Sequence, residues 1–255
     1  MQIDVEQILD ATSVADVRHF ELIDSTSLEA ARRVESADAA LPLLIVASRQ
    51  TAGYGCGENR WWTGSGSLAM TLVLHQDAVQ LPLGSPLLPL AVGVSWCDTL
   101  ASFLPNHAES KESPRLGLHW PNDIYLDGRK LAGILTERPA RPTVLRIGVG
   151  MNTNNTSADA PEEIRHLIAT WRDCCEATID HTELLVDWLP RLDRIFETAS
   201  ARPTEVARSA DALCLQKGEV SDFRDGAQRK FGRCLGIADD GGLRIETDGV
   251  ETTLY

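Results

Sequence analysis

The pattern of apolar residues divides the chain into two parts with different expected secondary structure. Over most of its length, apolar runs alternate with helix-like segments, whereas towards the C-terminus short strand-like runs are separated by turns of Asp and Gly. The continuous runs 43–48 and 67–75 predict buried strands, and the long run 86–104 predicts a central helix. Because tight turns join many strands, we expect a mixed, largely antiparallel sheet with flanking helices. We therefore predict an α+β fold with a first domain over 1–212 and a small β domain of the barrel type over 213–255.

Local signals also predict where single elements begin and end. A short N-terminal helix should run to about Val17, and a strand should follow over 20–23. Thr26 and Glu29 have the spacing of a capping box, which predicts Thr26 as the N-cap of a helix that ends near Ser36.

Two prolines mark expected positions in the later helices. Pro161 suits the first residue of a helix, because its missing N–H has no partner there in any case. The amphipathic segment 182–199 predicts a helix that Pro190 should kink or break.

Composition narrows the function classes. The formal net charge of −13 opposes non-specific binding to nucleic acid, which depends on neutralising phosphates. No apolar run is long enough to span a bilayer, and the N-terminus lacks the basic and apolar regions of a secretory signal, so we expect no membrane partner and a cytoplasmic location. The cysteines and histidines lack the paired spacing of a zinc site.

A glycine-rich segment over 50–62 is the first candidate for chemistry. Gly53, Gly55 and Gly57 alternate with other residues, which lets the backbone approach a ligand closely and present N–H groups to an anion. Trp61 follows and could stack on a planar ring such as a purine. The spacing is not that of a dinucleotide fingerprint, and glycines alone fit a surface turn equally well.

A predicted hairpin is the second candidate. The turn Asp127-Gly128 joins the apolar runs 124–126 and 131–136, which should place Asp123 and Lys130 on neighbouring strands within reach of one ligand. A lysine can neutralise a carboxylate or phosphoryl charge, and an aspartate can hold Mg²⁺ near ATP phosphates. Spacing alone favours a solvated hairpin with a surface ion pair.

Four motifs in order resemble those of biotin protein ligases. Trp-Pro-Asn-Asp at 120–123 with Lys-Leu-Ala-Gly-Ile-Leu at 130–135 resembles the family signature, and Gln-Thr-Ala-Gly at 50–53 resembles its ligand-binding loop. Ser-Thr-Ser at 25–27 is similar to the family's Ser-Thr-Asn motif, and 147–152 to its Gly-x-Gly-x-Asn motif. The resemblance covers most of the chain and implies a class II synthetase-like catalytic domain with an SH3-like β-barrel after it.

The resemblance implies a two-step reaction. ATP and biotin would give biotinyl-AMP and pyrophosphate, and a lysine of the biotin carboxyl carrier domain of a carboxylase would then attack the mixed anhydride. Lys130 and Asp123 would be catalytic, with Asp123 also supporting Mg²⁺. The implied biotin- or adenylate-binding residues are Ser25, Thr26, Ser27, Gln50, Gly53, Tyr54, Gly55, Cys56, Trp61, Lys130, Gly133 and Asn152. Trp61 would stack near the adenine, Gly133 would leave room for the ligand, and Asn152 would lie near the nucleotide.

The sequence departs from the family pattern in the glycine loop. Tyr54 and Cys56 stand where the family usually has arginines, and neither can grip a phosphate as a guanidinium does. His119 stands where a lysine is usual; its strand position favours packing. Arg49, Arg60 and Lys130 are the candidates to compensate for the lost charge.

Three functions stay open on the sequence: an active ligase, a relative that binds biotin without efficient adenylation, and a lipoate or octanoate transferase of the same fold. Trp120 to Asp123 and the β tail speak against the third. Few residues precede Ser25, so we expect no helix-turn-helix domain and no DNA partner. The sequence leaves open a homodimer and a further strand beyond Tyr255.

Overall fold

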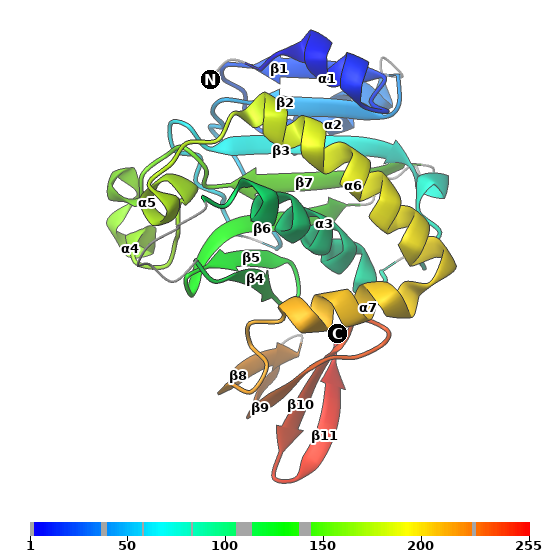
Figure 1. Ribbon diagram of the computed structural model, residues 1–255, viewed down its shortest axis with the longest axis vertical. Coiled ribbons are helices and arrows are strands. Elements are labelled where there is room, and N and C mark those ends of the chain that lie inside the picture. The colour runs from blue at the N-terminus through cyan, green and yellow to red at the C-terminus, as the bar shows by residue number, and fades with distance from the viewer. Residues whose placement is uncertain are drawn as a thin grey trace.

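A seven-stranded sheet organises the first part of the chain (Figure 1). The computed structural model describes residues 3–36, 40–57, 59–82, 84–105, 114–137, 144–225 and 228–255. The strand order is β1-β2-β3-β7-β6-β5-β4, and all neighbours are antiparallel except the parallel pair β1–β2. The strands are β1 (Asp16–Phe20), β2 (Leu43–Ala47), β3 (Leu68–His75), β4 (Leu116–His119), β5 (Asp123–Leu126), β6 (Arg129–Glu137) and β7 (Val144–Met151).

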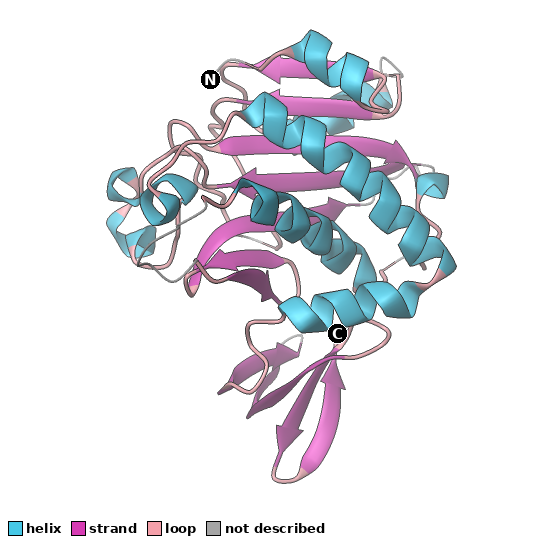
Figure 2. Cartoon of the chain, viewed as in Figure 1, coloured by secondary structure: helices cyan, strands magenta, loops and turns pink. Residues whose placement is uncertain are grey.

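Helices cover both faces of this sheet (Figure 2). The helices are α1 (Val5–Ala11), α2 (Thr26–Glu35), α3 (Leu87–Phe103), α4 (Glu162–Arg165), α5 (Trp171–Cys175), α6 (His181–Ala201) and α7 (Pro203–Leu213), with 3₁₀ turns η1 (Gln76–Ala78) and η2 (Ser157–Asp159). On β2, Leu44 and Val46 join the large core beneath α3 and α6, whereas Leu43 and Ile45 pack with Ala30 of α2 on the other face. Burial on both faces explains why the central strands are continuous apolar runs.

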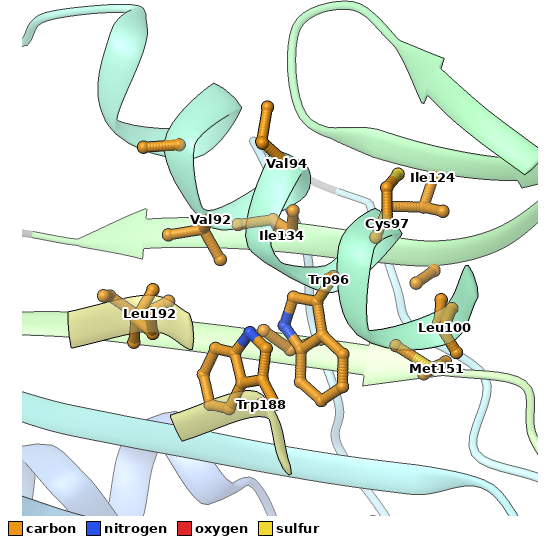
Figure 3. Packing of buried hydrophobic residues seen from close by; sticks show 14 of the residues in the cluster. Val92, Val94, Trp96, Cys97, Leu100, Ile124, Ile134, Met151, Trp188 and Leu192 are labelled. Atoms are coloured by element: carbon orange, nitrogen blue, oxygen red, sulfur yellow. The ribbon is translucent and has the colours of Figure 1, made fainter. Parts of the chain in front are cut away.

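Stacked tryptophans join the two long helices in the main core (Figure 3). The rings of Trp96 in α3 and Trp188 in α6 lie 4.3 Å apart between centroids and 13° from parallel. The indole N–H of Trp188 donates to Ser95 Oγ at 3.0 Å, so this buried polar group has a partner. The prediction of a central apolar helix is confirmed.

A second sheet follows α7. Its order is β11-β10-β9-β8, all antiparallel, with β8 (Val220–Asp225), β9 (Gln228–Ile237), β10 (Leu243–Thr247) and β11 (Val250–Leu254). The α+β fold class is thus confirmed, while the division into domains 1–212 and 213–255 stays a proposal.

The second sheet is bonded to the first part close to β4. Trp120 donates its backbone N–H to Gln216 Oε1 at 2.6 Å and its indole N–H to the Gly241 carbonyl at 3.0 Å. Asp211 of α7 accepts from the backbone N–H of Ile237 at 2.8 Å.

Two of the expected tight turns lie at the predicted positions. Asp127 and Gly128 between β5 and β6 have φ values of 50° and 74°, and Asp248 and Gly249 between β10 and β11 have 51° and 77°. Positive φ at both central positions is the type I′ pattern that Asp-Gly favours. Gly226 of a third expected turn lies outside the described parts of the chain. The same is true of Thr143, where a further strand was expected to begin.

The capping box was predicted one residue late. The N-cap of α2 is Ser25, and the structure gives it no side-chain capping bond. The Thr26 hydroxyl instead interacts with Gln50 and Thr71, while Glu29 accepts from Arg32 and Arg33. Thr26 therefore serves tertiary contacts, whereas Glu29 forms ion pairs within its own helix.

Other helix and strand boundaries also differ from those expected from the sequence. The first helix ends at Ala11, because the C-cap Thr12 is extended, and β1 ends at Phe20, where the strand was expected to begin. Pro161 is the N-cap of α4 rather than its first residue. α6 continues past Pro190, since buried residues such as Leu185 and Leu192 pack on both sides of it and outweigh the lost backbone hydrogen bond.

Candidate ligand-binding site

A cavity of about 600 Å³ lies where the start of α2, the glycine loop (50–62), the β5–β6 hairpin and β7 meet. It brings together nearly all of the residues predicted from the motifs. These are Ser25, Thr26, Ser27, Gln50, Tyr54, Gly55, Cys56, Trp61, Asp123, Lys130, Gly133 and Asn152. Gly53 is the exception, because it does not line the cavity.

Buried hydroxyl and amide groups form one end of the cavity. Gln50 Oε1 accepts from the Thr26 backbone N–H at 2.9 Å and from its hydroxyl at 3.2 Å. Thr71 Oγ1 lies 2.9 Å from Thr26 Oγ1 and 3.2 Å from Ser27 Oγ. Ser25, Thr26 and Ser27 are each at most 5% exposed, so this end presents oriented polar groups with little competing water. We call it the polar end.

The glycine loop folds back on itself beside the polar end. The Trp61 N–H donates to the Gly53 carbonyl at 2.9 Å, and the Gly55 N–H donates to the Asn59 carbonyl at 2.8 Å. A Cβ on Gly53 would lie 2.8 Å from Gln50 Nε2 and 2.9 Å from the Trp61 carbonyl oxygen. Gly53 thus allows the close approach of two chain segments. It does not line the cavity, and its role in ligand binding stays a prediction.

Trp61 rests on two glycines that face each other across β6 and β7. Gly133 and Gly150 are register partners. A Cβ on Gly133 would lie 3.2 Å from Trp61 Cζ3, and one on Gly150 would overlap the indole. The space beside Gly133 is therefore filled by the Trp61 ring and the Lys130 side chain, which the sequence analysis did not anticipate.

Asp123 and Lys130 meet at the cavity wall, as the hairpin predicted. Lys130 Nζ lies 2.7 Å from Asp123 Oδ2 and 5.7 Å from the centroid of the Trp61 ring. The side chains are 32% and 19% exposed for Lys130 and Asp123, so the pair is not a solvated surface pair. Asp123 Oδ1 is buried and has no hydrogen-bond partner among the described residues. It is an unfilled acceptor next to a cation.

Asn152 directly follows β7, lines the cavity and is 1% exposed. Its backbone N–H donates to the Leu131 carbonyl at 2.9 Å, and its side-chain oxygen accepts from Asn155 at 3.2 Å. The next residue, Thr153, donates its hydroxyl to the Gly66 carbonyl at 2.8 Å and lies 2.6 Å from His181 Nε2.

His181 is a neutral histidine beneath this segment. Its Nε2 lies 2.6 Å from Thr153 Oγ1 and 3.5 Å from Asn154 Nδ2. Burial lowers the pKa of His181 to about 4, so the ring is uncharged near neutral pH.

Cationic side chains line the cavity although the whole chain is acidic. Besides Lys130, Arg60 and Arg129 contribute to the wall, whereas Arg49 does not. Arg60 and Lys130 were predicted as compensating cations, but Arg129 was missed because its position after the turn resembles an exposed hairpin residue. An anion entering the cavity therefore finds positive charge.

Aromatic packing accounts for His119. Its ring stacks on Tyr125 with centroids 4.4 Å apart and an angle of 15°, and burial lowers its pKa. The expectation that His119 is a packed strand residue is thus confirmed. Tyr125 lines the cavity and was missed, as was the segment 164–168, since neither belongs to a motif.

Tyr54 faces the cavity and binds a residue distant in sequence. Its hydroxyl donates to Glu137 Oε1 at 2.9 Å, and Arg146 Nη2 lies 3.6 Å from the same oxygen. Sequence analysis missed Glu137 and Arg146, because only strand pairing brings the ends of β6 and β7 to the loop.

Within the described residues, no group of three or more His, Cys, Asp or Glu side chains is arranged to hold a metal ion. None of the described helices is long and apolar enough to cross a membrane.

Comparison with known proteins assigns the chain to a protein family. Residues 19–154 match the family described as biotin/lipoate A/B protein ligases. A biotin–[acetyl-CoA-carboxylase] ligase of Mycobacterium tuberculosis is 30% identical over 210 residues, which is 81% of this chain and 74% of that protein. The chain therefore belongs to the biotin/lipoate A/B protein ligase family.

More particularly, the chain is a member of the biotin protein ligase family. The bifunctional ligase/repressor BirA of Bacillus spizizenii is 28% identical over 236 residues, covering 89% of this chain and 69% of that protein. The structure of a biotin protein ligase from Aquifex aeolicus in complex with biotin and ATP has a TM-score of 0.79 at 24% identity, covering 94% of this chain and 95% of that one. The latter similarity is evidence for the fold.

Proposed function

We propose that this protein is an ATP-dependent biotin ligase that modifies a biotin carboxyl carrier domain. In the first step, a biotin carboxylate oxygen attacks the α-phosphorus of ATP, forming biotinyl-AMP and releasing pyrophosphate. In the second, the ε-amine of a carrier lysine attacks the anhydride carbonyl, forming an amide and releasing AMP and a proton.

The observation that carries this proposal is the convergence of four separated motifs on one cavity. Ser25 to Ser27, Gln50, Lys130 and Asn152 come from different elements, yet they line the same 600 Å³ space. A cavity of this size suits a small ligand that is held at both a polar and a charged end.

The polar end suits the ureido ring of biotin. Ring N–H groups and a carbonyl oxygen need acceptors and donors in fixed positions, and the hydroxyls of Thr26 and Ser27 with the amide of Gln50 supply both. Their burial makes each hydrogen bond stronger than it would be in water.

Lys130 would offset the negative charge that accumulates when a carboxylate approaches a triphosphate. It carries an ammonium group at the cavity wall, oriented by Asp123. Trp61 beside it offers an aromatic face to the nucleotide.

The residues present fit Mg²⁺ in part. Asp123 Oδ1 is an unfilled carboxylate acceptor, and Mg²⁺ usually takes one or two carboxylates with substrate phosphates and water completing its shell. Bound there, the ion would neutralise phosphate charge. Asp123 would then hold both the ion and Lys130.

A second candidate function, binding of biotin without efficient adenylation, is favoured by one observation. Tyr54 and Cys56 line the cavity, and neither carries the positive charge of the arginines usual in the family. Against this, Arg60 and Arg129 supply cations to the same wall.

The test is biotin-dependent exchange of labelled pyrophosphate into ATP with Mg²⁺. We expect exchange with biotin and much less with lipoate or octanoate at equal concentration. Biotin binding in calorimetry without exchange would overturn adenylation and favour the second candidate, whereas exchange supported mainly by lipoate or octanoate would indicate a transferase of the same fold. Transfer to a carrier domain is then followed by mass spectrometry.

A further inference from the structure

Tyr54 is one of the side chains that attach the glycine loop to the sheet, beside Trp61, which rests on Gly133 and Gly150. Its neighbours Gly53 and Gly55 have no side chains, and its hydroxyl donates to Glu137 Oε1 at 2.9 Å. Tyr54 is partly buried and lines the cavity, and Glu137 is the last residue of β6. Burial and the bond to Glu137 both raise the pKa of Tyr54, so the phenol remains a hydrogen-bond donor over the neutral pH range.

Arg146 holds Glu137 in place. The two residues are register partners on β6 and β7, and Arg146 Nη2 lies 3.6 Å from the Glu137 oxygen that Tyr54 binds. The Arg146 side chain is 10% exposed and that of Glu137 is 20% exposed. The two charges are thus paired in a largely enclosed position, while Glu137 Oε2 and Arg146 Nε have no hydrogen-bond partner among the described residues.

The same guanidinium reaches the polar end of the cavity. Arg146 Nη1 donates to the Ser27 carbonyl at 2.9 Å. Ser27 Oγ lies against β7, since a Cβ on Gly148 would be 3.2 Å from it. A continuous chain of contacts therefore runs from Tyr54 in the loop through Glu137 and Arg146 to Ser27 at the start of α2.

We propose that Tyr54 is a positioning residue that fixes the glycine loop over the polar end, and that it thereby sets the affinity for the ring of the carboxylic acid substrate. This inference rests on the proposed function for the identity of that substrate. A neutral phenol contributes little to phosphate binding, so its effect should fall on the acid rather than on ATP.

The experiment compares Tyr54→Phe with the control Tyr255→Phe. Tyr255 also donates its hydroxyl to a carboxylate, Asp240 at 2.6 Å, but it follows the last strand of the C-terminal sheet and does not line the cavity. Each variant loses one oxygen atom and keeps its ring, so both should fold. The first readout is backbone hydrogen–deuterium exchange of peptides spanning 53–62 in the ligand-free protein, and the second is KM for biotin against kcat in pyrophosphate exchange.

We expect Tyr54→Phe to exchange about tenfold faster in the loop and to raise KM for biotin by about tenfold, as suits the loss of a hydrogen bond to a charged group. The change in kcat and in KM for ATP should be smaller than the change in KM for biotin. Tyr255→Phe should leave the loop peptides and both KM values unchanged.

Three outcomes would separately overturn the fixing of the loop by Tyr54, its effect on the affinity for biotin, and the proposed function. Loop exchange equal to wild type would show that Tyr54 does not fix the loop, whatever the activity. Faster loop exchange with an unchanged KM for biotin would remove its role in affinity. Wild-type protein that neither binds biotin nor supports exchange would overturn the proposed function and the assignment of biotin, while the hydrogen-exchange comparison would still decide whether Tyr54 fixes the loop.

Discussion

The ammonium of Lys130 lies 2.7 Å from the carboxylate of Asp123, across the β5–β6 hairpin and at the wall of the cavity. The second oxygen of Asp123 is buried and has no hydrogen-bond partner within the described parts of the chain, and the Trp61 ring lies beside Lys130. Partial burial makes this charge interaction stronger than that of an exposed pair, and it holds the lysine where an anion would enter.

Replacing Lys130 by Met removes this charge while keeping a flexible chain of similar length. Under the proposed function we expect kcat for pyrophosphate exchange to fall by about 100-fold, because a cation that stabilises developing charge is lost. Lys217→Met is the matched control, since Lys217 pairs with Asp211 outside the cavity. Equal activities of the two variants, measured at matched thermal stability, would rule out the role assigned to Lys130.

Cys56→Arg would restore a guanidinium to the glycine loop. Cys56 is exposed and lines the cavity, so an arginine there can reach a bound phosphate without repacking a core. We expect kcat/KM for ATP to rise by about tenfold, the effect of one charge-assisted hydrogen bond. Cys56→Ser has similar size and no charge, and it should leave this parameter near the wild-type value. An arginine variant no better than the serine variant would mean that Arg60 and Arg129 already supply the charge.

A methyl group on Gly150 should displace Trp61. The added Cβ would occupy the position of the indole ring, so we expect Gly150→Ala to weaken nucleotide binding and to cost about 1–3 kcal/mol in free energy of unfolding. In the double variant Gly150→Ala, Trp61→Ala the steric conflict is absent, and most of the stability should return. Urea denaturation of the four proteins of the cycle measures this coupling, and additive effects would contradict the contact.

Stability should depend on pH through His181. Its pKa is about 4 in the folded protein, against an ordinary value of 6.5, because the ring is buried. Between these values the unfolded chain binds more protons, so the free energy of unfolding falls as pH is lowered from 6.5 to 4, by roughly 3 kcal/mol in total. Above pH 6.5 this group contributes no pH dependence.

The variant His181→Gln isolates this effect. Urea denaturation at pH 7.0 and 4.5 should show a smaller loss of stability on acidification in the variant than in wild-type protein. His75→Gln, at an exposed position, should lose as much as wild type. An identical acid dependence of all three proteins would contradict the buried neutral histidine.

The sequence predicted the elements well where one physical signal dominates. The apolar run at 86–104 is hydrophobic on all sides and became the central helix α3, and Asp127-Gly128 became the expected hairpin turn. The signal failed where tertiary contacts compete, as at Thr26, whose hydroxyl binds Gln50 instead of capping a helix.

For the site, too, the sequence predicted what local patterns determine and missed what tertiary contacts determine. Motif residues were placed on the cavity, because short motifs retain the chemistry that a ligand needs. Partners such as Glu137 and Arg146 belong to no motif, and only the register of β6 and β7 brings them to Tyr54. Strand register depends on the whole sheet, so local sequence could not provide these contacts.

Trp120 shows how far the support of the cavity extends along the chain. It precedes Asp123 by three residues, and both of its N–H groups are bonded to the C-terminal part, at Gln216 and Gly241. The hairpin that carries the charge pair is thus held in part by Gln216, which lies 96 positions after Trp120 in the chain. Damage to the small sheet should consequently displace Asp123, although none of the described residues of β8 to β11 lines the cavity.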